Sequence, residues 1–145
     1  MLRSLVDRFR RKPTVVPAED RLRLAYEPRL DGDADPGEVV WTWVPYEDDP
    51  KQGKDRPVLV IGYIGTRLAI LPLTSKDHTN HDDCVALGRG AWDRGDRTSY
   101  VKLDRVLAVA PNKVRREGAV LDKPRFDEVL GELKAYAARH GSHRA

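Results

Sequence analysis

The stretch QGKDRPVLVI, residues 52–61, places an arginine directly before a proline and a run of apolar residues. Residues 58–61 have the β-branched and aliphatic character of a buried strand. Pro57 is expected at the start or edge of that strand, because proline donates no ladder hydrogen bond. Arg56 is therefore expected at the boundary between a loop and a strand, where a fixed cation can meet an anionic ligand. The alternative is a loop arginine that pairs with Asp55 or another nearby carboxylate.

The string HTNHDDC gathers donors of the kind that bind metal ions. His78, His81 and Cys84 recur at three-residue spacing. Structural zinc sites usually pair two such dyads across the chain, but the other two histidines, His140 and His143, lie at the C-terminal end. We therefore expect a polar loop here, with no metal ion and no cofactor in the protein.

The apolar pattern predicts five or six short strands at close spacing, without helices between them. The expected strands are 39–44, 57–63, 68–74, 84–87, and a strand pair or one broken strand within 98–111. Glycine-rich and charged turns separate them. This spacing is typical of a small barrel or sandwich and argues against alternating βαβ units.

The C-terminal stretch LDKPRFDEVLGELKAYAARHG has helical periodicity instead. Asp122 is expected as the N-cap, Pro124 in the first turn, and Gly141 just past the last turn. Apolar residues recur at i, i+3, i+4 and i+7 spacing; they are Phe126, Val129, Leu130, Leu133, Tyr136 and Ala137. The expected fold class is therefore mainly β (α+β), a compact β-barrel closed by one amphipathic helix.

The N-terminal part differs in composition from the rest. Residues 1–12 hold five cations against one carboxylate, in a pattern typical of a short amphipathic helix that is solvated or loosely docked. Contact of this segment with RNA or a membrane surface is the alternative. We expect residues 1–35 to form a basic extension and connector, and residues 36–145 to form the barrel domain. Because the whole chain carries only +3, a nucleic-acid surface on the domain must be a local patch.

The overall composition is that of a globular protein. Its 145 residues are 40% hydrophobic and 34% charged, which fits one domain with extensions. No apolar run is long enough to cross a bilayer. The single cysteine, Cys84, excludes an intramolecular disulfide and suits a reducing compartment. We therefore expect a cytoplasmic protein without a membrane partner.

Three motifs occur in order along the chain: GEVVWTWVP, a loop ending in QGKDRPVLVIG, and AILPLTS. Together they resemble the PemK/MazF family of toxins from bacterial toxin–antitoxin pairs, over roughly residues 36–140. The resemblance implies an SH3-like barrel, a homodimer, a cognate antitoxin, and metal-independent, sequence-selective cleavage of single-stranded RNA. It also implies that Arg56 and Thr74 are the catalytic pair. Where it leads us to expect an arginine, this chain has Leu107, with Arg105 two residues earlier.

RNA can be cut without a metal ion because its own 2′-hydroxyl can attack the adjacent phosphate. The planar fork of Arg56 fits phosphate oxygens, and its high pKa favours electrostatic stabilisation over proton transfer. Thr74 can donate its hydroxyl to the same phosphate. Residues beside the two strand ends are expected to bind the RNA backbone; they are Gln52, Gly53, Lys54, Ser75 and Lys76. Trp43 or Trp92 can stack on bases, although core packing is the expected role of Trp41 or Trp43.

Two other functions stay open from the residues alone. One is a non-catalytic SH3-like module that binds protein or nucleic acid without cutting it. The other is a related barrel toxin that poisons a topoisomerase.

Overall fold

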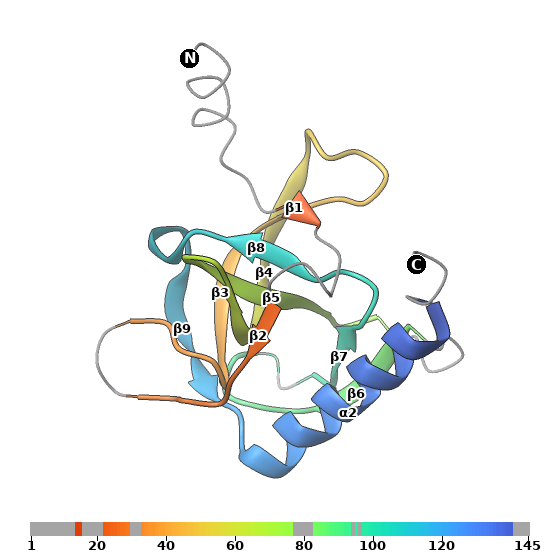
Figure 1. The fold of residues 1–145 in the computed structure, drawn as a ribbon. Coiled ribbons are helices and arrows are strands. Elements are labelled where there is room, and N and C mark those ends of the chain that lie inside the picture. Colours follow the sequence, from red (N-terminus) through yellow and green to blue (C-terminus); the bar gives the residue numbers. More distant parts are fainter. Residues whose placement is uncertain are drawn as a thin grey trace.

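The computed structural model describes residues 14–15, 22–29, 33–76, 83–93, 95 and 97–140. The described elements are a series of short strands followed by one long helix (Figure 1). In chain order they are β1 (Thr14–Val15), β2 (Leu22–Leu24), β3 (Glu38–Pro45), β4 (Gly53–Ile64), β5 (Arg67–Thr74), β6 (Cys84–Gly88), β7 (Ser99–Lys102), β8 (Leu107–Val109), the 3-10 helix η1 (Pro111–Lys113), β9 (Arg115–Val120) and α2 (Lys123–His140).

The strands form one antiparallel sheet that curls on itself (Figure 1). The main path through the sheet runs β1-β8-β5-β4-β3-β9. Off this path, β2 pairs with β4, and β7 pairs with both β5 and β6. The helix α2 runs along one side of this curled sheet. The predicted fold class, mainly β with one C-terminal helix, is confirmed.

Alternate residues of the central strands project into two hydrophobic clusters, as the period of a strand requires. Val39, Leu59 and Leu71 belong to the cluster that also contains the buried face of α2. Their chain neighbours Val40 and Val58 belong to the second cluster, between β3, β4, β5 and β8. The central strands are therefore buried on both faces, which fixes their register and holds the strand ends rigidly.

One strand boundary differs clearly from that expected. The strand predicted to begin at Pro57 begins at Gly53, because residues 53–57 already pair with β3 before the pairing with β5 starts at Val58. Pro57 is tolerated inside β4 because over this stretch the described partner is β3 alone. The stretch 98–111 is the pair β7 and β8, with a turn at Asp104 between them.

Helix α2 begins as the sequence indicated. The Asp122 carboxylate accepts a hydrogen bond of 3.1 Å from the backbone N–H of Arg125, which is the bond of an N-cap. Phe126, Val129 and Leu133 are its buried residues. No helix in the part of the chain that the structure describes is long and apolar enough to span a membrane.

Residues 22–29, which we call the strap, pack against the barrel although they were expected within a connector. β2 pairs Leu24 with Gly62, and the Tyr26 hydroxyl donates a 2.8 Å hydrogen bond to the Leu121 carbonyl. The Tyr26 ring lies 4.9 Å from the Phe126 ring, centroid to centroid. Gly62 makes room for this contact, because a Cβ atom there would lie 2.0 Å from the carbonyl oxygen of Arg23. The strap therefore joins the sheet edge to the start of α2.

Candidate functional site

A groove of about 870 Å³ opens where β4 runs past the last residue of β5. Six cationic side chains line it: Lys54, Arg56, Lys76, Arg97, Lys102 and Arg105. Four carboxylates line it as well: Glu47, Asp48, Asp55 and Asp93. The groove is thus a local cationic patch on a chain with little net charge, as expected for a polyanion site on this domain.

Arg56 and Thr74 lie across from one another on neighbouring strands. The ladder between β4 and β5 pairs Val58 with Pro72, and continuing this register by two residues puts Arg56 opposite Thr74. Arg56 and Thr74 each lie two residues beyond the last pair of this ladder, so their side chains belong to the same face as those of Val58 and Pro72. Both residues line the groove and are half-buried. Arg56 and Thr74 are therefore brought into the same groove, although a whole hairpin separates them in the sequence.

The Arg56 side chain is half-buried, and not all of its hydrogen-bond donors have partners in the part of the chain that the structure describes. Its Nε atom is buried and has no hydrogen-bond partner among the described residues. The neighbouring carboxylate of Asp55 pairs instead with Arg115 on β9, at 2.9 Å. Burial lowers the pKa of Arg56, and the positive charge of Arg105 lowers it further against the opposing effects of Tyr46 and Glu47. An anion that binds here would restore to the guanidinium the hydrogen bonds and the favourable charge interactions that it lost on burial.

Arg105 is a buried second guanidinium in the same groove, and sequence reasoning gave it no role. Its Nη1 donates a 3.1 Å hydrogen bond to the Pro45 carbonyl, which fixes the side chain on the end of β3. Its Nε lies 4.0 Å from a carboxylate oxygen of Glu47, and the other oxygen of Glu47 lies 3.4 Å from Lys102 Nζ. Burial disfavours the charged form of Lys102, but the carboxylates of Asp104 and Glu47 outweigh it and raise the pKa of Lys102. The sequence did contain a signal for Arg105. In the segment VKLDRVLAV, the position at which the family resemblance led us to expect an arginine is the buried Leu107, and Arg105 lies two residues before it.

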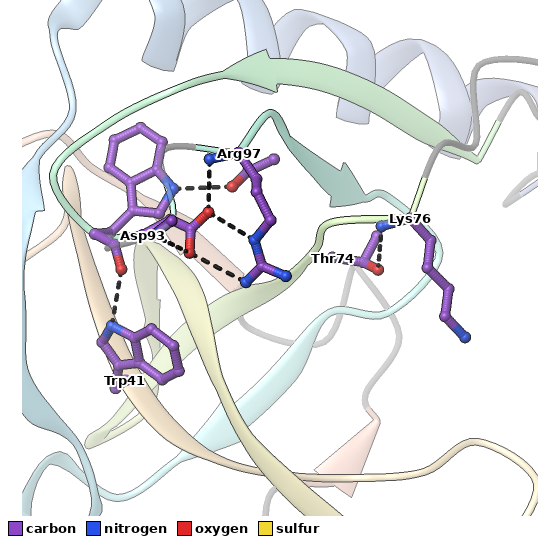
Figure 2. A network of polar contacts seen from close by, with 8 residues as sticks. Trp41, Thr74, Lys76, Asp93 and Arg97 are labelled. Atoms are coloured by element: carbon purple, nitrogen blue, oxygen red, sulfur yellow. Dashed lines mark hydrogen bonds and ion pairs between the residues drawn. The ribbon is translucent and has the colours of Figure 1, made fainter.

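An ion pair lies on the other side of the groove from Thr74 (Figure 2). The Asp93 carboxylate accepts hydrogen bonds from the Nε and Nη2 atoms of Arg97, both at 3.1 Å, and from its backbone N–H at 2.8 Å. The hydrogen bonds from Arg97 lower the pKa of Asp93. The charge of Arg97 is therefore paired with that of Asp93.

Tryptophans connect this side of the groove to β3. The indole N–H of Trp41 donates a 3.3 Å hydrogen bond to the Trp92 carbonyl, and Figure 2 shows Trp41 pointing toward the segment that carries Asp93. Trp92 is buried, and its own N–H donates to the Ser99 hydroxyl at 3.0 Å. Trp92 therefore packs in the core, whereas Trp41 is half-buried and lines the groove.

Three of the five residues expected to bind the RNA backbone line the groove: Lys54, Ser75 and Lys76. The backbone N–H of Lys76 donates to the Thr74 hydroxyl oxygen at 3.2 Å, which leaves the hydroxyl proton of Thr74 free to point at a ligand. Gln52 and Gly53 are not among the lining residues. The backbone N–H of Gln52 donates to the Asp49 carbonyl at 2.9 Å within the turn, and Gly53 lies in the ladder opposite Pro45.

No group of three or more His, Cys, Asp or Glu side chains within the described residues is arranged to hold a metal ion. His78, His81 and His143 lie outside the described residues. Cys84 is half-buried, and burial raises the pKa of its thiol to about 11, so the thiol is protonated at neutral pH.

Comparison with known proteins identifies a family. A family model described as a PemK-like, MazF-like toxin of type II toxin–antitoxin systems matches residues 35–136. Among solved structures, a chain from the MazE–MazF complex of Deinococcus radiodurans (Form-II) matches with a TM-score of 0.53 and 21% sequence identity, covering 74% of this chain and 98% of that chain. At this identity the likeness concerns the fold. Among curated proteins, none matches this sequence.

Proposed function

Because the chain belongs to the PemK-like, MazF-like family of toxins from type II toxin–antitoxin systems, we propose that it is a metal-independent endoribonuclease that cleaves single-stranded messenger RNA at selected sequences. The observation that carries this proposal is the half-buried side chain of Arg56, whose Nε is buried without a partner among the described residues and which lies in a groove lined by five further cations. Such a group destabilises the free protein and is stabilised by a bound phosphate.

In the proposed reaction the 2′-hydroxyl oxygen attacks the adjacent phosphorus, and the bond to the 5′-oxygen of the next nucleotide breaks. The products are a 2′,3′-cyclic phosphate and a 5′-hydroxyl. Arg56 donates hydrogen bonds to the phosphate oxygens, where negative charge increases in the transition state. Thr74, on the next strand β5, donates a hydrogen bond from its hydroxyl to the same phosphate, and the proton lost by the 2′-hydroxyl is balanced by the one gained by the 5′-oxygen. The lowered pKa of Arg56, caused first by burial and then by Arg105, strengthens these donated hydrogen bonds.

The groove favours single-stranded over double-stranded RNA. Trp41 and Tyr46 both line it and are half-buried, so each presents part of an aromatic face beside the cations. Unpaired bases can stack on such faces, whereas the bases of a duplex stack on one another. We propose that these two side chains contact bases next to the scissile phosphate. We also propose that the protein acts in the cytoplasm, because messenger RNA, its proposed substrate, is found there.

We further propose that the protein forms a homodimer and binds a cognate antitoxin. The support is its family and its likeness in fold to a chain solved as part of a MazE–MazF complex. Light scattering of the full chain tests the dimer, because a single subunit has a mass of 16.4 kDa. A mass of one subunit across the micromolar range contradicts it.

The test of the proposed activity is digestion of a defined single-stranded RNA by the purified protein, with mapped cut sites and analysed termini. We expect cleavage that EDTA does not slow, with 2′,3′-cyclic phosphate ends. Arg56→Ala should abolish cleavage, and Arg56→Lys should not restore it, because lysine lacks the planar fork. Arg115→Ala is the matched control, since Arg115 lies on β9, which pairs with β3, and is not among the residues that line the groove.

Three outcomes contradict the proposal in different ways. Full activity of Arg56→Ala removes Arg56 from the site. RNA that is bound but left intact indicates a binding module without catalysis. RNA that is neither bound nor cut, together with inhibition of a topoisomerase, indicates the other mode of toxicity.

A further inference from the structure

The two buried cations beside Arg56 are occupied in the free protein by a carboxylate of the chain itself. Lys102 and Arg105 expose only 14% and 9% of their side chains, and both line the groove. Glu47 contacts both of them, at 3.4 Å and 4.0 Å. One carboxylate therefore bridges two cations that come from different sides of the turn between β7 and β8.

In the contact of Glu47 with Lys102 and Arg105, the carboxylate is exposed, whereas other contacts hold the two cations in place. Glu47 exposes 52% of its side chain, on the turn that connects β3 to β4. Arg105 is held by its hydrogen bond to the Pro45 carbonyl, and Lys102 by its place at the end of β7 and by Asp104 at 3.9 Å. An exposed carboxylate at the outer limit of ion-pair distance is weakly bound and can leave without moving the cations.

We propose that Lys102 and Arg105 form a second phosphate subsite, for the phosphodiester next to the one that Arg56 binds, and that Glu47 occupies this subsite until an RNA strand displaces it. The inference rests on the proposed function in taking RNA as the polyanion. It assigns two residues, Lys102 and Arg105, to substrate binding. It also makes Glu47 an internal competitor of the substrate.

Physical reasons for this arrangement exist in both states of the protein. In the free state Glu47 supplies a counter-charge to Arg105 and a second one, besides Asp104, to Lys102, which lowers the cost of holding these cations away from water. In the bound state a phosphate at Arg56 tethers the strand, so the next phosphate reaches the subsite at a high effective concentration. Arg56, Lys102 and Arg105 line the same groove, so one RNA strand can contact all three.

The test uses the full chain and a fluorescein-labelled, single-stranded oligodeoxynucleotide, which lacks the 2′-hydroxyl and therefore cannot be cleaved. Fluorescence anisotropy gives the Kd as a function of salt concentration. We expect Glu47→Gln to bind the probe severalfold more tightly than the natural sequence. Its slope of log K against log salt should steepen by about 0.7, the value for one additional phosphate contact on a single strand.

Asp48→Asn is the matched control. Asp48 follows Glu47 directly, is exposed and lines the same groove, and no ion pair within the described residues joins it to Lys102 or Arg105. The substitution removes the same charge, so it reports the effect of charge alone. Lys102→Gln in the Glu47→Gln background should cancel the gain, and this variant avoids replacing the more deeply buried Arg105.

Equal increases in affinity for the probe in Glu47→Gln and Asp48→Asn overturn the proposed subsite, because they show that removing any negative charge from the groove has the same effect. Unchanged or weaker binding of Glu47→Gln overturns it as well. A gain that survives Lys102→Gln also contradicts the assignment, provided that thermal unfolding shows all variants to be folded. Tighter probe binding by Glu47→Gln in a protein that leaves RNA intact upholds the subsite and refutes the proposed cleavage, so the two proposals fail separately.

Discussion

Replacing Arg56 by methionine should abolish cleavage and at the same time stabilise the folded protein. Methionine keeps an unbranched apolar stem in the half-buried position and removes the charged head. The folded state disfavours that head, since its Nε is buried without a partner among the described residues and its pKa is lowered by burial and by Arg105. Function and stability therefore respond to this substitution in opposite directions.

The size of the gain follows from the cost of a buried donor that lacks a partner, which is about 1–3 kcal/mol. Arg56 is only half-buried, so solvent screens part of this cost, and we take the low end, about 1 kcal/mol. For a chain of this length, that corresponds to a rise in Tm of about 3 °C. A cation whose folded pKa is depressed is disfavoured at every pH below that pKa, so the gain should not change across the neutral range.

Thermal and urea unfolding of the natural sequence and of Arg56→Met measure the effect. Arg115→Met is the control, because Arg115 pairs with Asp55 at 2.9 Å and both side chains are about half exposed. Removing this surface pair should lower the free energy of unfolding by no more than about 1 kcal/mol. The reasoning is refuted if Arg56→Met lowers the Tm by several degrees, since Arg56 would then be a structural residue.

Two further predictions concern the strap and the loop across the groove. Gly62→Ala should detach the strap, because the added Cβ meets the Arg23 carbonyl at 2.0 Å, and limited proteolysis within residues 22–29 reports it; Gly131→Ala, where nothing lies within 4 Å, should instead stabilise α2 by about 1 kcal/mol. Equal effects of the two glycine substitutions contradict this. NMR titration should find the pKa of Asp93 below 3.8, so its pairing stabilises the fold above that pH and is lost as the pH falls through the depressed value. Arg97→Gln should bring the pKa back up, and an unchanged pKa contradicts the assignment.

The local patterns of the sequence were sufficient for the central elements. Apolar alternation placed β3 and β5 within a residue or two of their ends, and the Asp122 cap placed the start of α2. These signals depend on neighbours along the chain. Arg56 and Thr74 both line the groove, since each lies at a fixed position relative to a strand that the pattern defines.

The pairings between distant segments could not be predicted in this way. β2 alternates as LRL but is only three residues long, and β9 reads RREGAV without an apolar alternation, so partners across the sheet define both. The ion pairs between distant segments could not be predicted from the sequence either. Asp55 was weighed as a partner of Arg56, but the ladders bring Arg115 to it instead, and Glu47 reaches Arg105 only because the curled sheet closes.

The strap also determines when the fold can be completed. Tyr26 is synthesised early, but the carbonyl that its hydroxyl contacts follows 95 residues later, at Leu121. At a synthesis rate of about 5–20 residues per second, Tyr26 waits about 5–20 s for that contact. During this interval the edge of β4 around Gly62 can be covered, but the link to α2 cannot form. The strap thus waits for a contact that lies 95 residues further along the chain, and the sheet and the helix are joined through it only after Leu121 and Phe126 have been made.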